Sequence, residues 1–246
     1  MTKYIIGIDD TDNLESRGTG YKARQLALSI EDLGYAEVLS VSRHQLLVDR
    51  RIPYTSHNSS ASILINALVD IKSITDLCTL YLKEESAEGS DAGLCIAEFD
   101  CISEEVIRWG NRAKKEILTK KKAHELAEKE GIFLEGYKGK KIGVIGSLAA
   151  VGLRKEANDG RLLWLRNLRE SNGIYTVHDF KTWVNLDAVT RKNGTFVPGN
   201  EKIFIGEWCR PVHLKNKITL IAEKAYGNKS YQWRCASKEY IKSISE

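Results

Sequence analysis

The chain has 246 residues, of which 42% are hydrophobic and 28% are charged, and its formal net charge is +4. This length allows one large domain or two small ones of ~100–200 residues, and the composition excludes a disordered, collagen-like or coiled-coil chain. No apolar run reaches the ~18–20 residues needed to cross a membrane, and the first residues do not resemble a signal peptide. The five cysteines form no C-x-x-C pair, which argues against a disulfide framework and predicts a cytoplasmic protein.

The charge is unevenly distributed along the chain. Residues 171–246 contain 12 basic and 7 acidic residues, or +5, whereas the remaining 170 residues sum to −1. A basic last third favours an anionic partner such as RNA, although an ordinary solvated surface has the same composition.

Short apolar runs alternate with amphipathic segments in the first part of the chain, which predicts a mixed α+β or α/β fold. Strands are expected at 4–8, 38–48, 61–68, 93–99 and 132–134. Helices are expected at 21–33, at 74–83 and from Ser103 towards Gly131, the last one either continuous or broken near 120–122. The order strand–helix–strand–helix–strand suggests a ferredoxin-like subdomain over about 60–135, with one strand not identified. The small apolar residues of 139–152 are typical of a helix packed closely against other backbone.

The pattern of the sequence changes after residue 175, where short apolar runs and polar turns predict a β-rich unit. Strands are expected around 183–185, 202–208 and 218–223, with a turn at Lys192-Asn193-Gly194. We therefore expect a catalytic region at 1–170 and a β-rich C-terminal region at 171–246.

The strongest local signal is the acidic run Asp9-Asp10-Thr11-Asp12, directly after the first expected strand. Three carboxylates this close repel one another unless a cation offsets them. Mg²⁺ binds carboxylate oxygens together with substrate phosphates. Asp9, Asp10 and Asp12 are therefore candidate catalytic and metal-binding residues, and an acidic turn that only favours a loop is the alternative.

Three further segments offer anion-binding groups. Gly18-Thr19-Gly20 precedes a helix, where backbone N–H groups bind phosphates, although helix capping by Thr19 explains it equally. Arg43 and the loop 52–60, with Arg50, Arg51, His57 and Asn58, could hold a phosphate or a base, whereas an ordinary surface imidazole is the alternative for His57. Lys141 and Gly146 lie at a glycine-containing helix start that also suits an anion, or close packing. The run 120–122 of lysines is interpreted as a solvated face.

In chain order these segments resemble the archaeal tRNA agmatidine synthetases, the TiaS family. Gly7-Ile8-Asp9-Asp10-Thr11-Asp12 matches its G-I-D-D-T-D, Arg43 and Ile52-Pro53-Tyr54 match its R-L-x-I-P-Y, and 145–152 matches its I-G-A-L-A-A-I-G. The resemblance covers about 4–152 and implies a TiaS-like kinase domain with a ferredoxin-like subdomain.

The resemblance implies chemistry that uses ATP and Mg²⁺, in which a carbonyl is activated by phosphorylation and displaced by an amine. It assigns Mg²⁺–phosphate to Asp9, Asp10 and Asp12, with support from Thr11, and it assigns Thr19 and Arg43 to the family's loop threonine and arginine. The expected nucleotide contacts are Thr11, Gly18, Gly20, His57, Asn58, Lys141 and Gly146. The family's OB and zinc-ribbon domains are not evident in 246 residues with unpaired cysteines.

The leading hypothesis is therefore an ATP- and Mg²⁺-dependent phosphotransferase or ligase that acts on an unidentified small-molecule acceptor. One alternative is a tRNA-modifying enzyme that docks RNA on the basic C-terminal third. Another is a nucleotide sensor without catalysis. The oligomeric state is open, with a homodimer among the alternatives.

Overall fold

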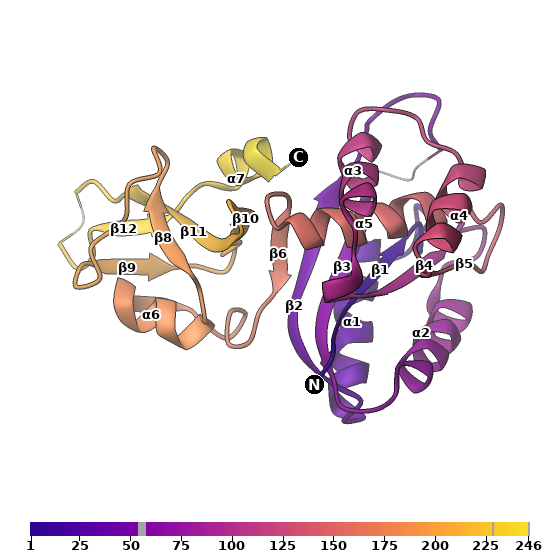
Figure 1. Ribbon diagram of the computed structural model, residues 1–246. Helices are drawn as coiled ribbons and strands as arrows, with labels where there is room; N and C mark the ends of the chain where they lie inside the picture. Colours follow the sequence, from indigo (N-terminus) through magenta and orange to yellow (C-terminus); the bar gives the residue numbers. More distant parts are fainter. Residues whose placement is uncertain (54–57, 228, 246) are drawn as a thin grey trace. The chain divides into compact units, whose positions relative to one another are not determined.

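The structure is a computed structural model that describes residues 1–53, 58–227 and 229–245 (Figure 1). The chain divides into two compact units, which we call unit 1, Met1–Glu156, and unit 2, Ala157–Glu246. The boundary expected between residues 170 and 171 thus lies inside unit 2 rather than at the division between the two units.

Unit 1 alternates strands and helices, as its periodicity predicts. Its strands are β1 (Lys3–Asp9), β2 (Ala36–Gln45), β3 (Ser59–Ala67), β4 (Gly93–Glu98) and β5 (Phe133–Gly136). Its helices are α1 (Thr19–Asp32), α2 (Ile71–Glu85), the short 3₁₀ helix Phe99–Cys101, α3 (Glu104–Ala113), α4 (Lys120–Lys129) and α5 (Val144–Glu156).

The first six elements of unit 1 form a ferredoxin-like βαββαβ arrangement. The strands lie in the order β5-β4-β1-β3-β2, and β1 is antiparallel to both β3 and β4. The chain order β1–α1–β2–β3–α2–β4 with β1 and β3 in the centre is the split βαβ topology. It spans 3–98 and includes the acidic run, whereas the sequence analysis placed the subdomain at about 60–135, with one strand not identified.

The two faces of this sheet are covered by different helices (Figure 1). Successive side chains of a strand point to opposite faces. Ile6 and Ile8 lie on the face covered by α1, whereas Ile5 and Asp9 lie on the face covered by α5. On the α5 side, the core continues into α3 through Val106 and Trp109, so this helix pair anchors the sheet end that carries the acidic run.

Helix α5 lies directly on the backbone of β1 and β4, which explains the glycines of this region. A Cβ on Gly7 would stand 2.1 Å from the carbonyl oxygen of Ser147, and one on Gly93 would stand 2.2 Å from the carbonyl carbon of Gly143. Both are far inside van der Waals contact, so only glycine permits this approach. The expectation of a closely packed helix in 139–152 is confirmed, with the helix beginning at Val144.

Unit 2 is rich in β structure, and the mixed α+β class expected from the sequence is confirmed. Its elements are β6 (Arg161–Trp164), β7 (Gly173–Thr176), α6 (Val177–Val184), β8 (Ala188–Arg191), β9 (Lys202–Ile205), β10 (Val212–Leu214), β11 (Lys217–Lys224), β12 (Trp233–Cys235) and α7 (Lys238–Ser245). The strands run β6-β10-β11-β12-β9-β7, and β8 pairs in parallel with β11. In the described part of the chain, no helix is long and apolar enough to cross a membrane.

The strand expected around 183–185 is wrong, because these residues end helix α6. The Thr176 side chain caps the helix by accepting a hydrogen bond from the Asp179 amide at 3.1 Å. Val177, Phe180 and Val184 are buried along one face of the helix. Asn185 ends it in the left-handed conformation with φ of 58°, which asparagine adopts more readily than most residues.

Candidate active site

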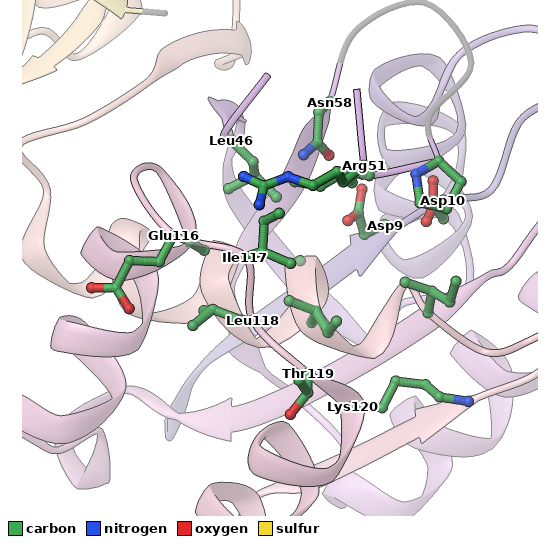
Figure 2. A pocket seen from close by; sticks show the side chains of 16 residues that line it. Asp9, Asp10, Leu46, Arg51, Asn58, Glu116, Ile117, Leu118, Thr119 and Lys120 are labelled. Carbon is green, nitrogen blue, oxygen red and sulfur yellow. The ribbon is translucent and has the colours of Figure 1, made fainter. Parts of the chain in front are cut away.

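The acidic run lies where β1 ends and the chain turns towards α1. Asp9 is the last residue of β1 and is 6% exposed, because its side chain points from the sheet towards α5. Asp10 then turns the chain in the left-handed region with φ of 52°, which aspartate tolerates better than most residues. The turn brings the carboxylates of Asp9 and Asp10 to the same side of one cavity (Figure 2).

The first two carboxylates of the run hold negative charge unfavourably. Burial raises the pKa of Asp9 well above its ordinary value of 3.8, and the charges of Asp10 and Asp12 raise it further. Burial also raises the pKa of Asp10 to about 7, with the charges of Asp91 and Asp12 adding to the effect. A cation bound beside these oxygens would relieve both effects, since an opposite charge favours the ionised carboxylate.

The Thr19 hydroxyl organises the other side of the run. It donates a hydrogen bond to Asp12 Oδ1 at 2.8 Å, and it accepts one from the Thr11 hydroxyl at 3.1 Å and one from the Thr11 amide at 3.3 Å. Gly18, rather than Thr19, is the N-cap of α1. Thr19 therefore fixes the shape of the acidic loop and orients Asp12 instead of capping the helix.

Gly146 leaves the space that the Asp9 carboxylate occupies. A Cβ at this position in α5 would stand 1.7 Å from Asp9 Oδ2 and 2.6 Å from Asp9 Cγ. Gly143, just before α5, approaches the Asp9 backbone in the same way, with an ideal Cβ 2.8 Å from the Asp9 carbonyl oxygen. The glycine motif of 145–152 and the acidic run, distant in sequence, thus meet in one site.

Asp91 is a fourth carboxylate of this region that the sequence reading did not identify. Its backbone amide donates to the Asp10 carbonyl at 3.1 Å, and its own carbonyl accepts from the Gly143 amide at 2.9 Å. Its side chain accepts a hydrogen bond from the Lys140 amide. Asp91 therefore ties the acidic loop to the segment before α5, and it adds negative charge next to Asp10.

A cavity of about 300 Å³ opens beside Asp9, Asp10 and Gly146 (Figure 2). Such a volume lies at the lower end of the range for small-molecule sites. Most of its wall is aliphatic and comes from three connecting segments, the end of α3 and α5: Leu46, Ile52, Pro53, Ala113, Ile117, Leu118, Ile142 and Ile145. An apolar wall next to two carboxylates suits a ligand with a flat or apolar body and a charged end.

Two cations also line this cavity. Arg51 reaches across it with its guanidinium pointing away from Asp10 (Figure 2), and it pairs with Asp49 at 2.7 Å. Lys120, the first residue of α4, donates to the Lys140 carbonyl. From the sequence we interpreted Lys120 as part of a solvated face, because nothing in the composition separates it from Lys121 and Lys122.

Of the other residues expected to contact the nucleotide or its phosphates, only some line this cavity. Asn58 lines the cavity, and its side chain donates to the Leu47 carbonyl at 2.7 Å. Arg43 does not line it; its guanidinium bonds Ser59 and Gln45 at 2.9 and 3.3 Å. Lys141 is exposed in a left-handed turn with φ of 59° and also does not line it. The lining likewise excludes Gly18 and Gly20, at the start of α1, and His57 lies outside the described residues.

The carboxylates do not form a metal cage by themselves. Within residues 1–53, 58–227 and 229–245, no group of three or more Asp, Glu, His and Cys side chains converges so as to hold a metal ion. Asp9 and Asp10 nevertheless both line the cavity. Mg²⁺ commonly takes one or two carboxylates and completes its octahedron with water and substrate phosphates. The donor set thus fits Mg²⁺ that arrives with a phosphate ligand.

No protein-family model matches the sequence, and no curated protein matches it. Solved structures do. A complex of TiaS with an isoleucine tRNA and ATP is 21% identical, with a TM-score of 0.58 over 99% of this chain and 55% of that chain. A complex of TiaS with the same tRNA, AMPCPP and agmatine is 20% identical, with a TM-score of 0.57 over 99% of this chain and 56% of that chain. The fold resembles that of TiaS.

A third structure matches a shorter part. A tRNA fluorescent labeling enzyme is 26% identical, with a TM-score of 0.52 over 61% of this chain and 36% of that chain. The chain spans about half the length of the TiaS chains it matches. The expected resemblance to the catalytic part of TiaS is therefore confirmed as a likeness of fold.

Proposed function

We propose that unit 1 binds ATP at the end of β1 and uses it to phosphorylate, and so activate, an acceptor. The observation that carries the proposal is the meeting of Asp9, Asp10 and Gly146 at one largely apolar cavity. Glycine at 146 is required by contact with the Asp9 carboxylate, which links the two motifs that resemble TiaS through a physical constraint. The TiaS-like fold and the ATP and AMPCPP of the matching structures support the assignment.

The carboxylates make a cation necessary for this role. ATP carries several negative charges, and two buried carboxylates at the cavity would repel them. Mg²⁺ held by Asp9 and Asp10 would neutralise the phosphates and the charge that develops on them during transfer. Thr19 contributes by holding Asp12 and the acidic loop in place. Lys120 and Arg51 lie on the cavity wall as candidate partners for phosphate oxygens.

The chemical step is a displacement at phosphorus. An acceptor oxygen attacks a phosphorus atom of ATP, a new P–O bond forms, and the P–O bond to the leaving phosphate chain breaks. Catalysis of such a step is mainly positioning and charge neutralisation. The buried, hydrogen-bonded acidic loop on a rigid strand end supplies the positioning.

We propose a tRNA nucleoside as the acceptor, in place of the small molecule that the sequence reading favoured. Two of the matching structures are TiaS complexes with an isoleucine tRNA, and the enzyme that matches at 26% identity labels tRNA. The basic excess of 171–246, +5, is suited to an RNA backbone. A small-molecule acceptor and a non-catalytic nucleotide sensor are the alternatives.

Nucleotide binding is tested by titration calorimetry with ATP and MgCl₂. We expect wild type to bind, and we expect Asp10→Asn to weaken binding at least ~10-fold, because metal–carboxylate contacts are charge-assisted. Asp32→Asn, which removes an exposed carboxylate at the end of α1, is the matched control and should bind as wild type does. Equal binding by wild type and Asp10→Asn would contradict the proposed site.

The acceptor is tested by filter binding and by product analysis. If tRNA is the acceptor, unmodified tRNA transcripts bind with an affinity that falls steeply as salt rises, and they take up radiolabelled phosphate or stimulate ATP turnover. ATP turnover without any effect of tRNA would favour a small-molecule acceptor. ATP binding with no ADP or AMP released over hours would favour the sensor.

A further inference from the structure

Unit 1 has a second, larger hollow that lies away from the acidic run. Its volume is about 710 Å³, compared with about 300 Å³ for the cavity at Asp9. Tyr4 and Ile96 line it from β1 and β4. Asp9, five residues after Tyr4 on the same strand, points to the other face because strand side chains alternate. The hollow therefore opens on the α2 side of the sheet, opposite the candidate active site.

The hollow has an apolar and aromatic lining. The sheet contributes the rings of Tyr4 and Phe133 and the side chain of Ile96, which is paired with Phe133 across the β4–β5 ladder. Ile71 at the start of α2 and Ile132 in the turn before β5 face it from the sides. These groups would bury the apolar body of a ligand and present ring faces to a cation.

The charged groups of the hollow are predominantly acidic. Asp76, Glu98 and Glu130 line it together with one cation, Lys72. Lys72 forms an ion pair with Asp76 at 2.7 Å, so these two charges offset each other within α2. The lining thus has an excess of negative charge from Glu98 and Glu130. Burial raises the pKa of Tyr4, and the charge of Glu98 raises it further, which agrees with a negative potential at the ring.

We propose that this hollow is a binding site for a small organic cation, an amine with an apolar or aromatic body. Its volume suits a small molecule, the rings and the two unbalanced carboxylates are complementary to an ammonium group, and the isoleucines are complementary to a hydrocarbon chain. The site is separate from the proposed ATP site, and it stands whether or not the ATP assignment is correct.

The test is an amide NMR titration of the full chain with phenethylamine, using uncharged phenethyl alcohol as the comparison ligand. We expect the amine to bind with a dissociation constant of about 1 mM or lower, as the ligand's size allows, and to shift the amide signals of Gly131 and Ile132. The alcohol should bind at least about fivefold more weakly, because it lacks the charge.

Two double variants identify the residues responsible. Glu98→Gln with Glu130→Gln should weaken amine binding at least about fivefold, since it removes the unbalanced carboxylates and keeps their shape. Glu84→Gln with Glu128→Gln changes the net charge equally at exposed positions outside the hollow, and it should leave binding unchanged.

Each of the following results would overturn the proposal. They are the absence of binding at 10 mM amine (about ten times the expected constant), equal affinities for the amine and the alcohol, and equal losses in the two double variants. Binding that is lost in Asp10→Asn would place the amine in the cavity at Asp9 and would likewise overturn it.

Discussion

Substitution of Gly146 by alanine tests the contact on which the candidate site depends. The new Cβ would stand 1.7 Å from Asp9 Oδ2 and 2.6 Å from Asp9 Cγ. A comfortable contact needs ~3.5 Å, so a buried carboxylate or the helix itself must move. Overpacking of this kind costs ~1–3 kcal/mol. Alanine is the better helix former by ~1 kcal/mol, so we expect a net loss of up to about 2 kcal/mol in the free energy of unfolding.

The same substitution should behave differently when the carboxylate is absent. After the two Asp9 atoms, the next nearest atom to this Cβ is Leu46 Cδ1, at 3.0 Å, the far end of a flexible side chain. An Asp9→Ala background removes the two closer atoms. Gly146→Ala should then be neutral or stabilising by up to ~1 kcal/mol, through helix propensity alone. The two substitutions should therefore be coupled by about 2 kcal/mol in a double-mutant cycle.

Fluorine NMR of fluorotryptophan-labelled protein in a urea series measures this coupling in unit 1. Trp109 is the single tryptophan of this unit, and its indole Nε1 donates to the Ile145 carbonyl at 3.1 Å, next to Gly146. The signals of the four tryptophans of unit 2 follow that unit separately and provide an internal control. An equal loss in the free energy of unfolding on Gly146→Ala in both backgrounds would show that the Asp9 carboxylate is not what requires glycine at position 146.

Three further predictions concern the acidic loop and unit 2. Burial raises the pKa of Asp10 to about 7, above its value in the unfolded chain, so this carboxyl destabilises the fold when it is ionised. The metal-free protein should therefore lose up to about 4 kcal/mol in the free energy of unfolding as the pH rises from about 4 to about 7. Asp10→Asn should remove much of this pH dependence in urea titrations, and an unchanged pH dependence would contradict the prediction. Thr19→Val should cost about 1–2 kcal/mol in urea denaturation, because Asp12 and Thr11 both lose their shared buried partner, whereas Thr19→Ser should retain most of the stability. Asn185→Gly should preserve or raise the melting temperature measured by calorimetry. Asn185→Ala should lower it, because a left-handed alanine costs ~1 kcal/mol of stability. Equal effects of the two variants would contradict the helix end described for α6.

The parts of the fold that were predictable are those where local chemistry and burial agree. The apolar β-branched run that forms β1 and the acidic residues after it are adjacent in sequence, so strand and loop could both be read directly. Gly146 was identified as a candidate from the glycine-containing helix start and from the resemblance. Its physical reason, the contact with Asp9, joins residues on different elements and cannot be predicted from either segment alone.

The parts that were missed depend on tertiary position. The cavity wall at 113–119 was hidden by the expectation of a long helix from Ser103 with a break allowed only near 120–122. Thr119 is the N-cap of α4, and its side chain accepts a hydrogen bond from the Lys122 amide. Asp91 looks like an ordinary loop residue until the strands bring it beside Asp10. The segment 183–185 has side chains typical of a strand, and the caps at Thr176 and Asn185 outweighed them. In each case a helix boundary or a long-range contact decided the outcome.

The backbone contacts between α5 and the sheet also indicate which parts of this molecule can be redesigned. A side chain added where a glycine contacts backbone atoms would clash at its Cβ, and no change of rotamer moves a Cβ. A library that randomises Gly7, Gly93 or Gly143 should therefore contain few folded members. The connections that supply the aliphatic wall, 113–119 among them, carry no such restriction. A search for variants with a changed acceptor should therefore vary that wall and leave the joint between helix and sheet untouched.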